Sequence, residues 1–387
     1  MKRLLFIISN LESGGVSKSM VSLLNTIDRE RYDVSLLILN PSGLFMELLP
    51  KDVRIITNPD MAALGMRVGG AWSLLKRGRI ALTFGHLVRM ALSCVSKSWA
   101  GWLLSRLMPA LEQEFDCVVD YNGQHQLYYM VDKVRAKKKI TFFHSDYDKW
   151  SYYRSMDARY FPKVDNIFTV SEHCVASLKR NFPDVASKVA CMENISNPKL
   201  IDEMSGAPID DMSEDVATIL TLGHICKAKG SDLAIKAAGI LKQQGVQFKW
   251  YFLGLDSKDM DYSALIKECG VEDCVVLLGL RVNPYPYIKR ATIYVHPTLF
   301  EGKSIALDEA KLMCKPVVVT NFSTVQDQFQ DRVNGTICEM TPEALATSVE
   351  ELLTTESLRD RYSKYLREHR VDNCNEINRL YDMFDSV

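Results

Sequence analysis

The 387-residue sequence lacks several features that would place it at once in a protein class. It has no Gly-x-Gly segment, which argues against a dinucleotide-binding motif, and no P-loop segment of the Gly-x4-Gly-Lys-Ser/Thr type. No uncharged apolar run approaches the roughly 18 residues that a membrane span needs. With 47 basic and 48 acidic residues the formal net charge is −1, so no overall basic field would attract nucleic acid.

The 10 cysteines also lack a functional pattern, because there is no Cys-x-x-Cys pair and no His-rich segment beside them. We therefore expect reduced thiols, as in a cytoplasmic protein, and no metal site. The first apolar run is only about six residues long and ends in Ser-Asn-Leu-Glu-Ser-Gly-Gly, which predicts a first β-strand rather than a secretory signal.

Short apolar runs rich in β-branched residues alternate with helix-like stretches along much of the sequence. Parallel strands covered by helices on both faces have this rhythm, because each crossover between such strands takes a helix. The strand-like runs are 4–9, 34–39, 216–222, 248–254, 274–279, 292–297 and 316–320, and the clearest helix-like stretches are 17–28 and 231–245. We predict an α/β protein with two doubly wound, Rossmann-like parallel-sheet domains that face a cleft. The break is expected at 197–214, a polar segment with two prolines and a glycine.

Residues 61–111 contain no Asp or Glu, so this segment is locally basic in a nearly neutral chain. Apolar residues recur in it at helical spacing. The basic residues are Arg67, Lys76, Arg77, Arg79, Arg89, Lys97 and Arg106, and the apolar ones are Phe84, Val88, Ala91, Val95 and Trp102. Two interpretations remain open. The helices pack their apolar face on the core, or they lie on an anionic membrane or a lipid diphosphate.

Two glycine-containing loops are candidate phosphate sites. Gly14 and Gly15 follow the first strand and open a helix, where free backbone amides and a partial positive charge attract an anion. In the second half, Gly223 and His224 follow a strand, and Lys229 precedes the glycine that starts the next helix. A loop at the carboxyl end of a parallel strand faces the ligand crevice in such folds.

Two carboxylates, Glu301 and Glu309, lie eight residues apart on one strand-loop-helix unit. A carboxylate suits a sugar or ribose because each of its oxygens accepts hydrogen bonds from hydroxyl groups. We expect the intervening loop to expose backbone amides as a further anion site. Its residues are Gly302, Lys303, Ser304 and Ile305.

The order of these motifs resembles retaining glycosyltransferases of family 4, which have the two-domain GT-B fold. The likeness is carried by GHICKAKG (223–230), HPTLFEGKSIALDEAKLM (296–313), the glycine turn near the start and TVSEHC (169–174). It implies an N-terminal acceptor-binding domain at 1–196 and a donor-binding domain at 197–372. Residues 373–387 would form a helix that crosses back to the first domain.

The resemblance also implies roles for single residues. Glu309 would hold the ribose of a nucleotide, Glu301 would lie beside the donor sugar, and Lys229 would neutralise the diphosphate with help from Gly15. Family members usually carry arginine where this chain has His224. His144, which follows an apolar strand, resembles the acceptor-side histidine found in part of the family.

The function implied is transfer of a hexosyl unit, with retention, from a nucleotide-diphosphate sugar to a hydroxyl of a glycan or polyprenyl-linked acceptor in surface polysaccharide synthesis. A UDP-sugar is the favoured donor, and no cofactor or metal is expected. The protein would be cytoplasmic, with peripheral membrane contact through 61–111. The alternatives are a nucleotide-sugar epimerase of the same architecture and a sugar-binding protein without chemistry.

Overall fold

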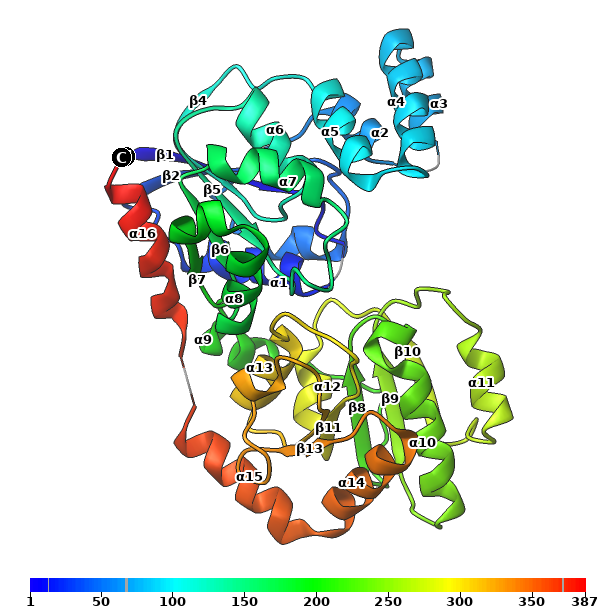
Figure 1. Cartoon of the computed structure of the whole chain (residues 1–387). Helices are drawn as coiled ribbons and strands as arrows, with labels where there is room; N and C mark the ends of the chain where they lie inside the picture. Colours follow the sequence, from blue (N-terminus) through cyan, green and yellow to red (C-terminus); the bar gives the residue numbers. More distant parts are fainter. Residues whose placement is uncertain (13, 67–68, 371) are drawn as a thin grey trace. The chain divides into compact units, whose positions relative to one another are not determined.

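The computed structural model describes residues 1–12, 14–66, 69–370 and 372–387, which form two compact units (Figure 1). The first unit comprises Met1–Ile195 with Cys374–Val387, and the second is Ser196–Asn373. The joins predicted after residues 196 and 372 each lie one residue from those of the structure. Ser13 of the predicted glycine turn and Arg67 of the basic segment lie outside the described residues.

The first unit is built on a parallel sheet of seven strands in the order β3-β2-β1-β4-β5-β6-β7. The strands are β1 (Lys2–Ile8), β2 (Tyr32–Ile38), β3 (Arg54–Ile56), β4 (Glu114–Asp120), β5 (Arg135–Phe143), β6 (Asn166–Thr169) and β7 (Val189–Cys191). The run expected as a first strand is therefore β1, which pairs with β2 on one side and β4 on the other. Because β1 is central and covered on both faces, residues Leu4 to Ile8 are all buried.

Helices connect these strands as parallel crossovers require. They are α1 (Gly15–Thr26), α2 (Pro59–Gly65), α3 (Gly70–Lys76), α4 (Ile80–Ser93), α5 (Lys97–Leu107), α6 (His125–Lys133), α7 (Arg154–Tyr160) and α8 (Glu172–Asn181). The connection from β3 to β4 carries α2 to α5, and α3 and α4 lie at the edge of this unit (Figure 1).

The second unit has a parallel sheet of six strands in the order β10-β9-β8-β11-β12-β13. The strands are β8 (Thr218–Leu222), β9 (Lys249–Leu253), β10 (Val275–Gly279), β11 (Ile293–His296), β12 (Val317–Thr320) and β13 (Thr336–Cys338). The helices are α9 (Pro198–Met204), α10 (Ser231–Gln243), α11 (Tyr262–Glu268), α12 (Tyr285–Arg290), α13 (Ile305–Leu312), α14 (Pro342–Thr354) and α15 (Glu356–Glu368).

Both faces of this second sheet are buried, which explains why its strands read as continuous apolar runs. Alternate residues of one strand enter different core clusters. Trp250 and Phe252 of β9 pack with α10 and α14, whereas Tyr251 and Leu253 pack with α12 and α13. The prediction of two parallel-sheet α/β domains is confirmed.

The C-terminal helix α16 (Ile377–Asp385) belongs to the first unit. Its Phe384 is fully buried against Phe6 of β1 and Tyr32 of β2. Tyr381 stacks on Tyr32, with ring centroids 5.3 Å apart. The chain therefore returns from the second unit to the first, and burial of one such aromatic side chain contributes about 1.5–3 kcal/mol.

Candidate functional site

The loop after β8 is held against the end of β11 by close backbone contact. Gly230 has a left-handed φ of 67°, and a Cβ added there would lie 1.8 Å from the Pro297 carbonyl oxygen. Likewise, a Cβ on Gly254 would lie 1.8 Å from the carbonyl oxygen of Gly223. Glycine at these positions lets the loop approach its neighbours and brings Lys229 to the end of β11.

Lys229 and Glu301 form the charged centre of the site. The Lys229 Nζ lies 2.5 Å from Glu301 Oε1, and His296 Nε2 lies 3.2 Å from the same oxygen. Burial would raise the pKa of Glu301, but the Lys229 charge and the His296 hydrogen bond outweigh it and lower the pKa to about 2. Glu301 is therefore ionised throughout the physiological range.

His296, the last residue of β11, was not selected from the sequence. It is 4% exposed, and burial lowers the pKa of its ring, which is therefore neutral at pH 7. Because an ionised carboxylate only accepts hydrogen bonds, His296 Nε2 carries the ring proton and donates a hydrogen bond to Glu301. The Ser304 hydroxyl lies 3.2 Å from the same nitrogen. A histidine at the carboxyl end of a parallel strand is the signal that could have identified it.

The amides at the start of α13 are partly used by the protein itself, which corrects one expectation. The Ser304 amide donates to Gln328 Oε1 at 2.9 Å, and Gln328 Nε2 donates back to the Ser304 carbonyl at 2.8 Å. The Ser304 amide was expected to be exposed for an anion, and it is buried and paired instead. Gln328 lies 24 residues away in sequence, so no local pattern indicates this pairing.

The other residues of this loop lie at the same strand end. Ile305 begins α13, Gly302 is buried, and Lys303 is half-buried.

Glu309 lies in the body of α13, 2% exposed. The Tyr285 hydroxyl donates a hydrogen bond of 2.8 Å to its Oε1. Burial and the adjacent carboxylate raise the pKa of Tyr285 well above its usual value, so the phenol remains a donor. Tyr285 was also missed, because its contact depends on how α12 packs beside α13.

His224 is half-buried, and its Nδ1 lies 3.4 Å from the Ser257 hydroxyl. Burial and the nearby Lys229 charge lower the pKa of His224. It is therefore neutral at pH 7 and adds no charge where an arginine would add one.

The predicted residues of the first unit lie in separate places. Gly14, with φ 91°, precedes α1, and Gly15 is the first residue of that helix. His144 follows β5, and its ring packs against Tyr121 and Phe142, with centroids 4.7 Å and 5.6 Å away. Burial lowers the pKa of His144 to about 4.

Within the described parts of the chain, no group of three or more His, Cys, Asp or Glu side chains is placed to hold a metal ion. None of the described helices is both long enough and apolar enough to cross a membrane.

Residues 209–369 match the family model described as glycosyl transferases group 1. This part of the chain is a member of that family. The match lies inside the second unit and contains Lys229, Glu301 and Glu309. The resemblance found in the sequence is confirmed at this level, and the narrower assignment to family 4 stays a prediction.

Two curated glycosyltransferases are similar to this chain over part of their length. One is N-acetylgalactosamine-N,N'-diacetylbacillosaminyl-diphospho-undecaprenol 4-alpha-N-acetylgalactosaminyltransferase of Campylobacter jejuni, 26% identical over 204 residues, 52% of this chain and 54% of the relative. The other is the amylovoran biosynthesis glycosyltransferase AmsK of Erwinia amylovora, 30% identical over 152 residues, 37% of each protein. The chain thus matches about half of the first relative and less of the second.

A solved structure shares the fold over the whole chain. HepE from Anabaena, in complex with UDP and glucose, superposes with a TM-score of 0.71 at 13% identity and covers 100% of both chains. At this identity the likeness establishes the GT-B fold of the chain and not its substrates.

Proposed function

We propose that this protein is a retaining, metal-independent glycosyltransferase of family 4 that moves a hexosyl unit from a nucleotide-diphosphate sugar to an acceptor hydroxyl. The observation that carries the proposal is the Lys229–Glu301–His296 cluster at the carboxyl end of β11, where a parallel sheet binds ligands. A cation and a carboxylate held together there suit a diphosphate leaving group beside a sugar.

In the proposed reaction the donor diphosphate competes with Glu301 for Lys229. When the donor phosphate forms an ion pair with the Lys229 ammonium, the Glu301 carboxylate is released from Lys229 and becomes available to the sugar. The carboxylate keeps its hydrogen bond from His296 Nε2–H. Lys229 then stabilises the negative charge that develops as the diphosphate departs. Because His224 is neutral, this single lysine carries more of that task than in relatives with an arginine.

The nucleotide end of the donor is assigned to Glu309, whose buried carboxylate would accept hydrogen bonds from the ribose hydroxyls. The loop before α13 is assigned to binding of the donor phosphates, through Gly302, Lys303, Ser304 and Ile305. The Ser304 amide itself donates its hydrogen bond to Gln328. Gly14 and Gly15, at the start of α1, are also assigned to the donor phosphates. The donor is proposed to be a UDP-sugar, in keeping with the UDP bound to HepE.

The acceptor is proposed to be a glycan or a polyprenyl-linked sugar, used in surface polysaccharide synthesis. The names of the relatives, an amylovoran enzyme and one acting on a diphospho-undecaprenol compound, support this class. His144 is assigned to the acceptor side, where its neutral ring would orient the hydroxyl. As the bond from the anomeric carbon to the phosphate oxygen breaks, the acceptor oxygen bonds to that carbon on the same face, and the acceptor proton passes to the departing phosphate. Attack on this face accounts for retention without a covalent intermediate.

A cytoplasmic location with peripheral membrane contact belongs to the same proposal. Ile80 and Phe84 of α4 are 72% and 71% exposed, and Val95 beyond the helix is 85% exposed. One of the two interpretations of 61–111 required the apolar face to pack on the core. These side chains of α4 and Val95 are exposed instead. An apolar helix face in a segment that has basic but no acidic residues suits the surface of an anionic membrane.

The test is a transfer assay with EDTA present, in which UDP-hexoses are incubated with the protein and extracted polyprenyl-linked acceptors. Transfer of the sugar with the anomeric configuration of the donor is expected. Epimerised nucleotide sugar without an acceptor product would support the epimerase alternative, and an inverted linkage would contradict retention.

A further inference from the structure

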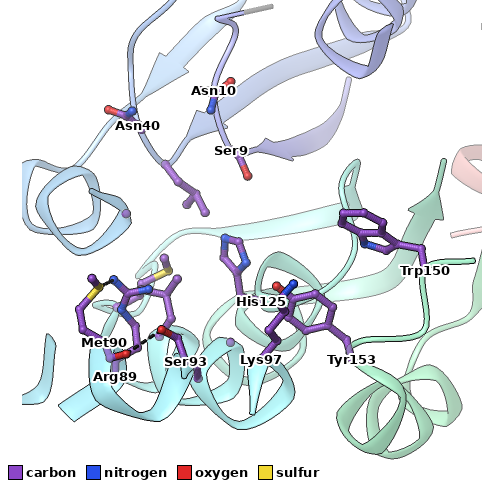
Figure 2. Close-up of a pocket in the computed structure, with 16 residues that line it drawn as sticks. Ser9, Asn10, Asn40, Arg89, Met90, Ser93, Lys97, His125, Trp150 and Tyr153 are labelled. Carbon is purple, nitrogen blue, oxygen red and sulfur yellow. Dashed lines mark hydrogen bonds between the residues drawn. The ribbon is translucent and has the colours of Figure 1, made fainter. Parts of the chain in front are cut away.

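A pocket of about 630 Å³ in the first unit belongs to none of the groups described so far. It is lined by 16 residues, and Figure 2 shows the polar ones around a common space. Ser9 and Asn10 come directly after β1, Asn40 comes shortly after β2, and His125 opens the helix that follows β4. The remaining wall comes from α4, α5 and the segment before α7.

This position is where the fold favours a ligand. From β1 the sheet continues to β2 on one side and to β4 on the other, so its strand order reverses at β1. The crevice outside the carboxyl ends of the strands at such a point is open, because the connections leave in opposite directions. The pocket lies at that crevice of the first sheet.

The wall that faces the strands is cationic. Arg89 and Ser93 of α4 and Lys97, the first residue of α5, line the pocket, and none of its described lining residues is acidic. The Arg89 guanidinium lies 3.5 Å from His86 Nδ1 and 3.1 Å from Met90 Sδ, both neutral groups. Burial and the Arg89 charge lower the pKa of His125 to about 4, so the neutral ring can donate or accept a hydrogen bond.

Helix α4 contributes to both this pocket and the exposed apolar face, through its two opposite sides. His86 is buried, and Arg89, Met90 and Ser93, at three- and four-residue spacing along the same side of the helix, line the pocket. Ile80, Phe84, Leu87 and Val88 recur on the opposite side and are exposed. One helix thus presents exposed apolar side chains on one side and the cationic Arg89 to the pocket on the other.

We propose that this pocket binds the phosphate group of the acceptor, with Arg89 and Lys97 as its ligands and Ser9, Asn10 and Asn40 as hydrogen-bonding partners opposite them. Trp150, at the far end of the pocket from Arg89 in Figure 2, offers an aromatic ring for a sugar of the same molecule. The inference deepens the proposed function by naming the acceptor as a phosphate- or diphosphate-linked compound.

The experiment measures binding by calorimetry in a Lys229→Gln background, so that the proposed donor site does not capture the probes. The probes are inorganic diphosphate, farnesyl diphosphate and farnesol. The test variant adds Arg89→Gln and Lys97→Gln, and the control adds Lys51→Gln and Arg54→Gln, exposed residues at the amino end of β3. We expect at least tenfold weaker diphosphate binding in the test variant and less than a twofold change in the control.

Tighter binding of farnesyl diphosphate than of inorganic diphosphate identifies a lipid-linked phosphate, and equal binding identifies a soluble one. Equal affinity of the test variant and its parent, or no binding of either diphosphate, would overturn the inference. If the double substitution does not fold, Lys97→Gln alone is used, because this side chain is exposed, and a threefold loss is expected. UDP binding to the unmodified protein is measured separately, so failure of the proposed donor site is distinguished from failure of this pocket.

Discussion

The Lys229–Glu301 ion pair is the residue-scale feature on which the proposed chemistry depends. Lys229→Ala removes the positive charge beside the departing diphosphate, and one such preorganised group contributes about 3–4 kcal/mol. We expect turnover to fall by roughly two orders of magnitude or more. Steady-state kinetics with the donor measures this, and Lys236→Ala in α10 is the matched control. Near-normal turnover from folded Lys229→Ala would remove Lys229 from the mechanism.

Glu301→Gln separates binding from chemistry. Because the Glu301 carboxylate competes with the donor phosphate for Lys229, its neutral analogue should bind UDP as tightly as the unmodified protein or more tightly, while turnover falls sharply. Equilibrium titration with UDP and a turnover assay give the two quantities. A parallel loss of UDP affinity and turnover would show that Glu301 does not compete for this lysine.

His144 makes the stability of the protein depend on pH. Its pKa is about 4 in the folded protein and about 6.5 when unfolded, so only the unfolded chain takes up the proton between these values. Stability from this group is present above pH 6.5 and is lost as the pH falls toward 4. Between pH 4 and 6.5, we expect His144→Gln to reduce the slope of the unfolding free energy against pH by the amount that uptake of about one proton produces. Denaturant titrations at several pH values measure it, and an unchanged slope would contradict the assigned burial.

At the residue scale, the sequence allows candidate site residues to be selected when they lie within one local motif. Lys229, Glu301 and Glu309 were identified by their place in loops and helix starts, and Lys229 does meet Glu301. His296, Gln328 and Tyr285 were missed. Their contacts join β11, α12, α13 and the segment after β12, and such contacts are decided by tertiary packing rather than by local spacing.

At the scale of elements, α4 carries the most specific expectation. Its exposed apolar side chains should enter the interface of an anionic bilayer. We expect Ile80→Ser with Phe84→Ser to reduce binding to phosphatidylglycerol vesicles at least fivefold. Leu255→Ser, which changes a leucine 47% exposed in the second unit, should leave binding unchanged.

Co-sedimentation with vesicles of phosphatidylglycerol and of phosphatidylcholine measures this difference. Equal binding of the serine variant and the unmodified protein to the anionic vesicles would show that α4 does not contact the membrane.

The strands β1, β2 and β8 to β12 and the end of β5 were predictable because each has a continuous apolar pattern, and α1 and α10 because theirs is periodic. The pattern of 61–111 was less informative, since one apolar stripe was expected from Phe84 to Trp102. The structure ends α4 at Ser93 and starts α5 at Lys97, where the Ser96 hydroxyl caps the new helix by accepting from the Trp99 amide. Trp102 therefore packs toward the core while Phe84 does not.

At the scale of the whole molecule, the sequence indicates the function of the second unit more directly than that of the first. The family match covers residues 209–369, inside the second unit, whereas the acceptor pocket lies in the first. Apolar runs predicted β8 to β12 of the second sheet, but only β1, β2 and the end of β5 in the first. The pocket could not be predicted, because it collects residues from the segments after β1 and β2 and from α4, α5 and α6, which no sequence window contains.

The central claim, that the second unit binds a nucleoside diphosphate through the Glu309 site, is tested most directly by thermal unfolding with UDP in the presence of EDTA. A ligand at 100 times its dissociation constant adds about 2.7 kcal/mol, which raises the midpoint by a few degrees in a chain of this size. We predict this rise for the unmodified protein and for Glu343→Ala, a glutamate at the start of α14 with the same eight-residue spacing to Glu351. Glu309→Ala should show none. Equal stabilisation of Glu309→Ala, or no stabilisation of the folded unmodified protein by any nucleoside diphosphate, would contradict the claim.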